Sequence, residues 1–287
     1  MDTRFLASFV AVVDEGSMAA AARLLNITPA AVAQRVRALE GEIGTALVSR
    51  AGRTVAPTEA GLAILDRARS LSRDVRDLQA VAAGDQPAGE LRVGANSTSV
   101  SGLLPAVLNR LNKHHPAVRV ILGRGHSSGL YQQLVDRQID VAMITEPSFV
   151  LPKSCDWREI RREPLVLITP SSLRRRDPVR ILKSEPFIRY NQGRWGRANI
   201  TNYLRANDIK PQQRFELDSL DAIAIMVDRG LGVSLIPDFA GPWPEGLAVR
   251  KRAVGGDTYE RRIGLVWLRA SARLRLIRAF VEEFENA

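Results

Sequence analysis

After about residue 90, short apolar segments alternate with longer amphipathic ones, and this alternation constrains the fold more than any other feature of the sequence. Segments 91–95, 118–123 and 140–145 are typical of strands, and segments 102–115 and 128–138 between them have helical periodicity. Strands that alternate with helices in this way form a parallel sheet. The pattern therefore predicts a β-α-β-α-β unit in an α/β domain.

Further elements complete the same domain. Strands are predicted at 164–170, 187–191, 214–217, 231–237 and 263–269, and helices at 198–207, 220–230 and 271–285. The 287 residues of the chain favour about two domains. We expect residues 90–287 to form two Rossmann-like subdomains, subdomain I at about 90–160 and 263–287 and subdomain II at about 161–262. Two crossovers, near residues 160 and 262, would form the hinge between them.

Residues 1–57 have a different pattern, which predicts an all-α-rich domain. A first helix ends at Gly16, Ser17 can cap a second helix, and Thr28 can cap a third. Segment 46–58 predicts two short strands around an arginine-tipped turn. Three helices with a tight turn before the third, followed by such a hairpin, are typical of a winged helix-turn-helix.

The third helix, from Thr28 to about Glu40, has an apolar face and a polar face. Its predicted buried stripe consists of Val32, Val36, Leu39 and Ile43, and the opposite face carries Pro29, Ala30, Ala33, Gln34 and Arg37. Small side chains allow close approach to DNA, and a glutamine amide can pair with an adenine edge in the major groove. Arg50 and Arg53 in the hairpin can reach the adjacent minor groove. The alternative is an ordinary helical subdomain with a solvated polar face.

The N-terminal sequence closely resembles that of LysR-type transcriptional regulators. The matching residues are Gly16-Ser17, Ala21-Ala22, Leu25, Thr28-Pro29, Ala31-Val32, Arg37-Ala38-Leu39-Glu40, Arg50, Arg53 and Pro57-Thr58-Glu59-Ala60-Gly61. Two later segments, LVDRQIDVAMI and MVDRGLGVSLIP, resemble the effector domain of this family, which is similar to type II periplasmic binding proteins. The resemblance covers essentially the whole chain. It implies a homodimer or homotetramer that binds a partly palindromic operator.

The resemblance also implies a set of DNA-binding residues. They are Thr28, Pro29, Ala30, Ala33, Gln34, Arg37, Arg50 and Arg53. This chain has Ala30 and Ala33 where the family often has serine, so both positions lack a hydroxyl that could contact phosphate or base. Gln34 is therefore the main candidate for base reading.

A long helix is predicted from Thr58 to about Ala83, and residues 83–89 form a linker. Ile64, Ala68, Leu71, Val75, Leu78 and Ala82 recur at spacings of three and four, which is a heptad seam. The resemblance implies that such helices pair between chains. We therefore assign residues 58–89 to dimerisation and linkage, and residues 1–57 to DNA binding. The alternative is an apolar face that packs on its own domain.

Ligands of open α/β sheets bind beyond the carboxyl ends of the strands. Hydroxyl-rich loops follow two predicted strands, at 96–101 and 124–129, and lead into helices whose N-termini favour anions. With other loops of this edge, the candidate effector-binding residues are Ser97, Thr98, Ser99, Ser127, Ser128, Thr145, Tyr190, Arg194 and Ser219. The alternative for any one serine or threonine is a helix cap. Glu146 lies nearby and favours an amine, so a zwitterion satisfies both features.

The excess positive charge lies in the predicted effector domain. The net charge is +10, but residues 1–90 hold 10 Lys and Arg against 11 Asp and Glu, whereas residues 91–287 hold 31 against 20. The bulk charge is therefore weak evidence for DNA binding, and it favours an anionic small ligand instead.

The composition also disfavours several kinds of chemistry. Cys155 is the only cysteine, so neither an intrachain disulfide nor a cysteine-based zinc site is expected. The three histidines show no zinc-protease pattern and no Ser-His-acid pattern. Segment 123–129 resembles a dinucleotide fingerprint, but Ser128 stands where the fingerprint requires glycine. We predict no catalytic residues, no metal and no cofactor; an α/β enzyme that binds a small molecule, without a transcriptional role, is the alternative.

The expected protein is a cytoplasmic, ligand-responsive transcriptional regulator. No apolar run approaches the about 18–20 residues of a membrane span, and Asp2, Arg4 and Asp14 interrupt the region where a signal peptide is apolar. Its expected partners are an operator in double-stranded DNA, a small anionic or zwitterionic effector and further copies of the chain. RNA polymerase is a further candidate partner, and no membrane is expected. The effector, the target genes, activation or repression, dimer or tetramer, and the roles of Cys155 and His126 stay open.

Overall fold

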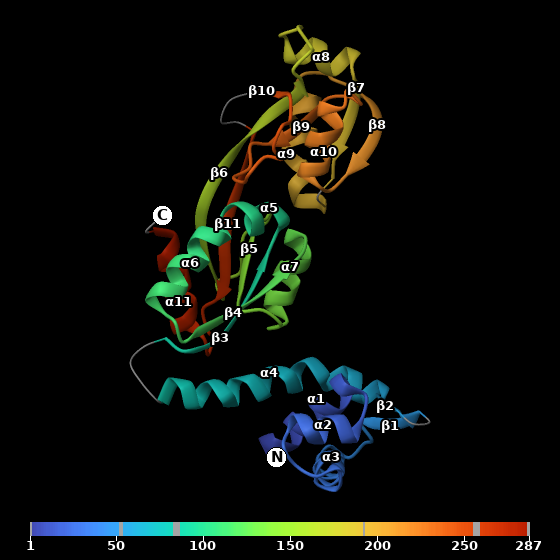
Figure 1. The fold of residues 1–287 in the computed structure, drawn as a ribbon, viewed down its shortest axis with the longest axis vertical. Coiled ribbons are helices and arrows are strands. Elements are labelled where there is room, and N and C mark those ends of the chain that lie inside the picture. The colour runs from blue at the N-terminus through green and yellow to red at the C-terminus, as the bar shows by residue number, and fades with distance from the viewer. Residues whose placement is uncertain (1, 52–53, 83–86, 192, 255–258, 286–287) are drawn as a thin grey trace. The chain divides into compact units, whose positions relative to one another are not determined.

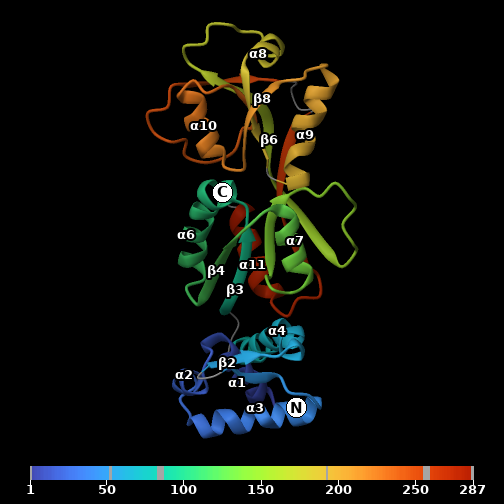
Figure 2. The ribbon, with the colours of Figure 1, turned by 90° about the vertical axis from the view of Figure 1, so that its right-hand side faces the viewer.

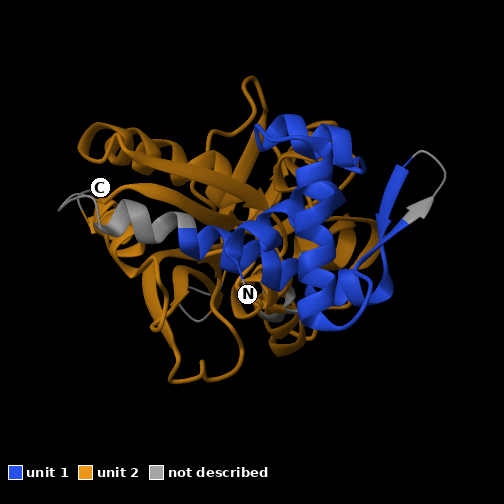
Figure 3. Ribbon diagram, turned by 90° about the horizontal axis from the view of Figure 1, so that it is seen from below, with its two compact units in different colours: residues 1–86 blue, residues 87–287 orange. Residues whose placement is uncertain are grey.

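The computed structural model of the chain describes residues 2–51, 54–82, 87–191, 193–254 and 259–285. These residues form two compact units, Met1–Gln86 and Pro87–Ala287 (Figure 3). Each unit has its own hydrophobic core. Among the described residues, no helix has both the length and the apolar character needed to cross a membrane.

Unit 1 is a small helical domain with a hairpin (Figure 1). Its elements are α1 (Thr3–Glu15), α2 (Met18–Leu24), α3 (Pro29–Ile43), β1 (Val48–Ala51), β2 (Thr54–Pro57) and α4 (Glu59–Ala82). The predicted caps are present: Ser17 Oγ accepts a hydrogen bond from the Ala20 N–H, and Thr28 Oγ1 accepts one from the Ala31 N–H at 3.2 Å. The predicted winged helix-turn-helix fold is confirmed.

The apolar stripe of α3 packs against the first two helices. Val32 lies in one buried cluster with Ala21 of α2, and Leu39 lies in a second with Phe9 of α1. The predicted burial of Ile43 is wrong, because this residue is 39% exposed. It is the last residue of α3, where the helix extends past these clusters.

The apolar seam of α4 is divided between two environments. Ile64 and Ala68 pack into the core of unit 1 with Leu6 and Phe9 of α1. This is the intrachain packing that the sequence left open as an alternative for part of the seam. Leu71, one turn further on, is 40% exposed. Leu71 is therefore the described seam residue best placed to contact a second chain, and pairing between chains stays a prediction.

The strands of unit 2 form one large mixed sheet and one smaller pair. They are β3 (Gly89–Ala95), β4 (Val118–Arg124), β5 (Val141–Thr145), β6 (Cys155–Pro170), β7 (Pro186–Tyr190), β8 (Gln212–Leu217), β9 (Ser234–Pro237), β10 (Val249–Ala253) and β11 (Glu260–Leu268). The large sheet has the order β10-β6-β11-β5-β3-β4, and β9 also pairs with β6. As predicted, β3 is parallel to β4 and β5, and β7 is parallel to β8. The other pairs are antiparallel.

Helices cover both faces of the parallel strands β3, β4 and β5. The helices of unit 2 are α5 (Ser97–Gly102), α6 (Leu104–His114), α7 (Ser127–Val135), α8 (Pro178–Ser184), α9 (Gly193–Ala206), α10 (Leu220–Asp228) and α11 (Leu274–Glu285). Side chains alternate along a strand, so Val141 and Met143 of β5 pack with α6 and α11, whereas Ala142 and Ile144 pack with α7. Figure 2 shows α6 and α7 on opposite sides of β3 and β4.

The long strands β6 and β11 extend from subdomain I into subdomain II (Figure 1). The two subdomains keep separate hydrophobic clusters, one around α10 and β9 and the others around β5. The register between β6 and β11 shifts at Ile263 and Gly264, opposite Arg161 and Glu159. This irregularity lies where the sequence predicts the two crossovers.

Several elements of unit 2 differ from the prediction. The segment predicted as a loop at 96–101 forms the short helix α5, which Asn96 caps by accepting a hydrogen bond from the Ser99 N–H, and α9 begins at Gly193 rather than at 198. β6 begins at Cys155, well before the predicted start at Pro164, because charged residues and the register shift interrupt the alternation that marks a strand. The sequence pattern does not predict β10 or α8. β10 has the sequence VRKRA and α8 has seven residues, so neither carries a run of apolar positions long enough to detect.

Candidate functional site

Helix α3 presents its polar face to solvent, as a helix that enters a DNA groove must. Thr28, Pro29, Ala30, Gln34 and Arg37 are exposed, and Ala33 is half-buried. The Arg37 guanidinium donates to the Ala33 carbonyl oxygen at 3.3 Å, so this side chain lies along its own helix. The Gln34 side chain is exposed, and its contact with a base stays a prediction.

The hairpin is held at its base by two polar side chains. Glu40 Oε1 accepts hydrogen bonds from the N–H groups of Leu47 and Val48 at 2.8 and 3.2 Å. The Thr58 hydroxyl donates to a carbonyl oxygen before β1 at 2.8 Å and accepts from the Gly61 N–H at 3.0 Å. A Cβ at Gly61 would lie 2.1 Å from the Leu47 carbonyl oxygen, so α4 approaches this loop too closely for any residue but glycine. These contacts fix the hairpin relative to α3.

The hairpin carries the predicted arginines at its tip. Arg50 lies opposite Val55 across the two strands. The side chain of Arg50 and the whole of Arg53 lie outside the described residues. Their contact with a minor groove stays a prediction.

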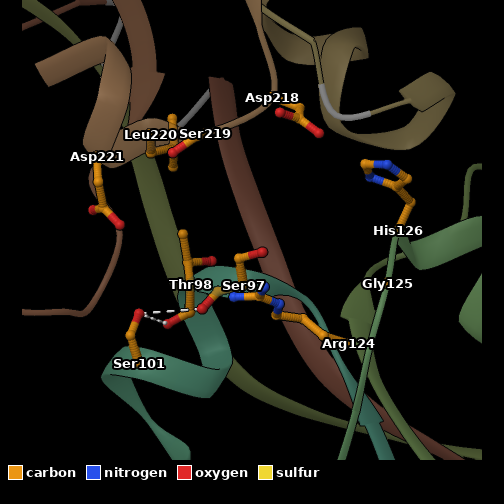
Figure 4. A pocket seen from close by; sticks show the side chains of 10 residues that line it. All are labelled: Ser97, Thr98, Ser101, Arg124, Gly125, His126, Asp218, Ser219, Leu220 and Asp221. Atoms are coloured by element: carbon orange, nitrogen blue, oxygen red, sulfur yellow. Dashed lines mark hydrogen bonds between the residues drawn. The ribbon is translucent and has the colours of Figure 1, made fainter.

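Unit 2 contains a cavity of about 380 Å³ between its two subdomains (Figure 4). It is lined by Ser97, Thr98, Ser101, Arg124, Gly125, His126, Asp218, Ser219, Leu220 and Asp221. These residues follow the carboxyl ends of β3, β4 and β8, which is where ligands bind in open α/β sheets. The cavity is polar and large enough for a small metabolite.

Basic and acidic side chains line opposite sides of this cavity. Subdomain I contributes the Arg124 guanidinium and the His126 imidazole, and subdomain II contributes the carboxylates of Asp218 and Asp221. Figure 4 shows His126 and Asp218 on facing walls, with Arg124 reaching toward Ser97. The arrangement can hold a ligand that carries both an anionic and a cationic group.

The sequence prediction did not include these charged residues. Asp218 and Asp221 flank Ser219 at the start of α10, and Arg124 ends β4, so the signal was a charged residue beside each predicted hydroxyl. Glu146, the acidic residue expected nearby, does not line the cavity. It lies 3.6 Å from Arg262 instead.

The structure brings three of the predicted effector residues into the cavity: Ser97, Thr98 and Ser219. Ser219 also caps α10, because its hydroxyl oxygen accepts a hydrogen bond from the Ala222 N–H at 3.3 Å. Helix-cap and ligand-binding roles are therefore compatible at this residue. Binding of the effector by these three side chains stays a prediction.

The other predicted effector residues do not line the cavity. They are Ser99, Ser127, Ser128, Thr145 and Tyr190. The side chain of Arg194, the remaining candidate, lies outside the described residues, so its role stays a prediction. Ser127 Oγ accepts a hydrogen bond from the Thr145 N–H at 3.0 Å, and both residues are buried, so this contact joins α7 to β5. Tyr190 is 1% exposed, and burial raises the pKa of its phenol to about 12.

Comparison with known families gives matches over both units. The family described as "Bacterial regulatory helix-turn-helix protein, lysR family" matches residues 3–62, and that described as "LysR substrate binding domain" matches residues 84–287. The chain is 29% identical over 241 residues to the "HTH-type transcriptional regulator CzcR" of Bacillus cereus. The aligned region covers 84% of this chain and 81% of that protein.

Solved structures share the same fold. A full-length variant of OxyR from Pseudomonas aeruginosa aligns with a TM-score of 0.71 and 20% identity, covering 99% of this chain and 95% of the other. Full-length CbnR, in a structure with its target DNA, aligns with a TM-score of 0.70 and 22% identity, covering 100% of this chain and 99% of the other.

Proposed function

This chain belongs to the LysR family of bacterial transcriptional regulators, and we propose that it controls transcription in response to a small zwitterionic or anionic metabolite. The observation that carries this proposal is the cavity of unit 2, with Arg124 and His126 on one side and Asp218 and Asp221 on the other. A ligand that bridges the two sides contacts both subdomains. It therefore stabilises one subdomain arrangement over others.

We assign operator reading to α3 and the wing. Gln34 would pair with a base in the major groove, and Arg37 would contact the DNA backbone or a base nearby. Thr28, Pro29, Ala30 and Ala33 would pack against the groove, and Arg50 and Arg53 would contact the minor groove or its phosphates. This assignment rests on the exposure of α3 and on the family to which the chain belongs.

We divide the chain by role into three parts. Residues 1–57 would bind DNA, residues 58–89 would link and dimerise, and residues 90–287 would bind the effector. Because operators of this kind are partly palindromic, a second copy of the chain would occupy the other half-site. A regulator that binds the bacterial chromosome works in the cytoplasm, and RNA polymerase is the partner through which it would act. No enzymatic activity is proposed.

The test is binding to the DNA upstream of the gene that encodes this chain. A gel shift of this DNA by the purified full-length chain, resisted by excess unrelated DNA, is the expected result. The Asp218→Asn variant should shift the same DNA but lose its response to metabolites that affect the wild-type chain. The absence of any sequence-selective shift, together with turnover of a metabolite, would instead support the enzyme alternative.

A further inference from the structure

A buried ion pair joins the two strands that connect the subdomains. Arg261 of β11 and Glu163 of β6 lie directly opposite each other, and they are 4% and 1% exposed. Arg261 Nε donates to Glu163 Oε2 at 2.6 Å, and Nη2 lies 2.5 Å from the same oxygen. A buried pair of this kind adds little stability over an apolar pair of similar volume. Its effect on the position of neighbouring groups is therefore of more interest than its energy.

The remaining hydrogen bonds of the pair reach three other elements. Arg261 Nη2 donates to Thr98 Oγ1 of α5 at 3.1 Å, and Nη1 donates to the Tyr190 hydroxyl of β7 at 3.4 Å. Glu163 Oε1 accepts a hydrogen bond from the Ala240 N–H at 3.2 Å. The pair thus connects the hinge strands to α5 on one side of the cavity and to β7 and the loop after β9 on the other.

The two subdomains pack closely, backbone against backbone, around Ala240. A Cβ placed on Gly102 of α5 would lie 1.5 Å from the Ala240 carbonyl oxygen. The backbone of α5 therefore touches the backbone of the loop that Glu163 holds. Thr98 lies four residues earlier in the same short helix.

The hydrogen-bonding partners of Thr98 determine what its hydroxyl can offer a ligand. Asn96 Oδ1 accepts from the Ser99 N–H at 2.9 Å, which identifies it as the amide oxygen, so the Thr98 hydroxyl must donate its proton to it at 2.9 Å. A guanidinium has only donors, so Thr98 accepts from Arg261. The Thr98 hydroxyl oxygen then has one unused lone pair, so it can accept one further hydrogen bond.

We propose that Arg261, held by Glu163, is a positioning residue for effector recognition, because it fixes the Thr98 hydroxyl as an acceptor toward the cavity. The effector must then present a hydrogen-bond donor to Thr98. This inference rests on the proposed effector site and adds the chemistry of its ligand. The carboxylates of Asp218 and Asp221 are also acceptors, so they favour the same donor. An ammonium group can donate a hydrogen bond to any of these acceptors, and Arg124 can hold an acidic group of the same ligand.

The ligand class is therefore a free amino acid or a close analogue that keeps its amine. The test uses the full-length chain and measures dissociation constants for matched pairs: phenylalanine with 3-phenylpropionate, glutamate with glutarate, and lysine with 6-aminohexanoate. Each second compound lacks the α-amino group. We expect at least one amino acid to bind and to exceed its partner by about tenfold or more, as one hydrogen bond to a charged group implies. If only compounds without the α-amino group bind, or if no amino acid binds, the inference is wrong.

Variants separate positioning from simple support of the fold. Thr98→Val should lower the ratio of amino acid to deaminated acid by about tenfold, and Thr98→Ser should restore it. Arg261→Met leaves Glu163 buried with only the longer ion pair to Arg161, at 3.7 Å, and can fail to fold. The double change Arg261→Met, Glu163→Leu is therefore the informative variant. It should lower the same ratio, and adding Thr98→Val should change it little further.

The matched control is Arg262→Gln, because Arg262 is the neighbouring arginine and its side chain is 41% exposed. It should leave the ratio unchanged. If the double variant weakens all probes equally, Arg261 only supports the fold and the inference is wrong. Operator binding by the same samples separates the two proposals, because a chain that still binds its operator but prefers deaminated acids contradicts this inference alone.

Discussion

At the scale of single residues, the assignment of Gln34 makes a direct prediction. The Gln34→Ala variant should bind the operator about 1–3 kcal/mol more weakly and lose preference at one base position. The Arg23→Ala variant is the control, because Arg23 is exposed on α2 and has no proposed base contact. Competition binding with operators changed one base at a time would measure both effects. Equal affinity for every base change in the wild-type chain would contradict the assignment.

Ser97 and Ser127 are the first residues of α5 and α7, but their surroundings differ, so we expect different effects. Ser127 accepts a hydrogen bond from the buried Thr145 N–H, and Ser127→Ala should lower the free energy of unfolding by about 1–3 kcal/mol. Ser97 is exposed in the cavity, and Ser97→Ala should change effector affinity while leaving the free energy of unfolding within about 0.5 kcal/mol. Urea unfolding of the two variants measures the difference. A larger loss for Ser97→Ala would reverse these roles.

The buried phenol of Tyr190 predicts a pH dependence. Its pKa in the folded chain is about 12, against 10.0 in the unfolded chain, so the unfolded state releases its proton first as pH rises. The stability that this group contributes is complete below pH 10 and is lost between pH 10 and 12, by about 2–3 kcal/mol. Tyr190→Phe should remove this part of the alkaline loss. An identical decline in both chains would show that other groups cause it.

The serines also show how far residue types alone can predict a site. The sequence places hydroxyls after the correct strands, and Ser97, Thr98 and Ser219 do line the cavity. It cannot show that Ser127 turns inward to a backbone N–H, because that depends on how α7 packs on β5. Nor does the sequence show that Asp218 and His126 line the same cavity, since only the fold brings these residues together.

At the scale of elements, helix α4 predicts how copies of the chain associate. Leu71 is 40% exposed on the seam, whereas Ile64 and Ala68 are used within unit 1. Leu71→Glu should weaken self-association, because it places a charge in an apolar seam. Leu62→Glu is the control, since Leu62 is 59% exposed on the same helix but lies off the seam. Sedimentation of both variants, with helicity checked by circular dichroism, should show smaller assemblies for Leu71→Glu alone. Unchanged assembly of Leu71→Glu would exclude pairing through this position.

Elements with a clear period are predicted well from the sequence, and elements without one are not. The caps at Ser17 and Thr28 and the short apolar run of β5 identify their helices and strand correctly. The first half of β6 is missed because its side chains belong to a bent strand paired with β11, where charged residues such as Arg161 and Arg162 are exposed. Such a strand is specified by its partner rather than by its own period.

At the scale of the whole molecule, the two units are coupled only if the effector changes the affinity for the operator and the operator changes the affinity for the effector. This coupling is reciprocal: if the effector changes operator affinity by some factor, the operator must change effector affinity by the same factor. The prediction can therefore be checked in either direction, by titrating effector with and without saturating operator and by titrating operator with and without effector. Two different factors would show that another species takes part.

Two variants should separate the affinity for the effector from the factor by which the effector changes operator affinity. Asp218→Asn should weaken effector binding similarly with and without operator, because Asp218 lines the cavity from the loop after β8 rather than from β6 or β11. The double change Arg261→Met, Glu163→Leu should reduce the coupling factor itself, because this pair joins β6 and β11 to α5 and to the loop around Ala240. A coupling factor near one in the double variant, with operator affinity retained in the absence of effector, is the expected result. An undiminished factor would show that the signal leaves the cavity by another route, such as the aromatic contacts of Trp195 with α7.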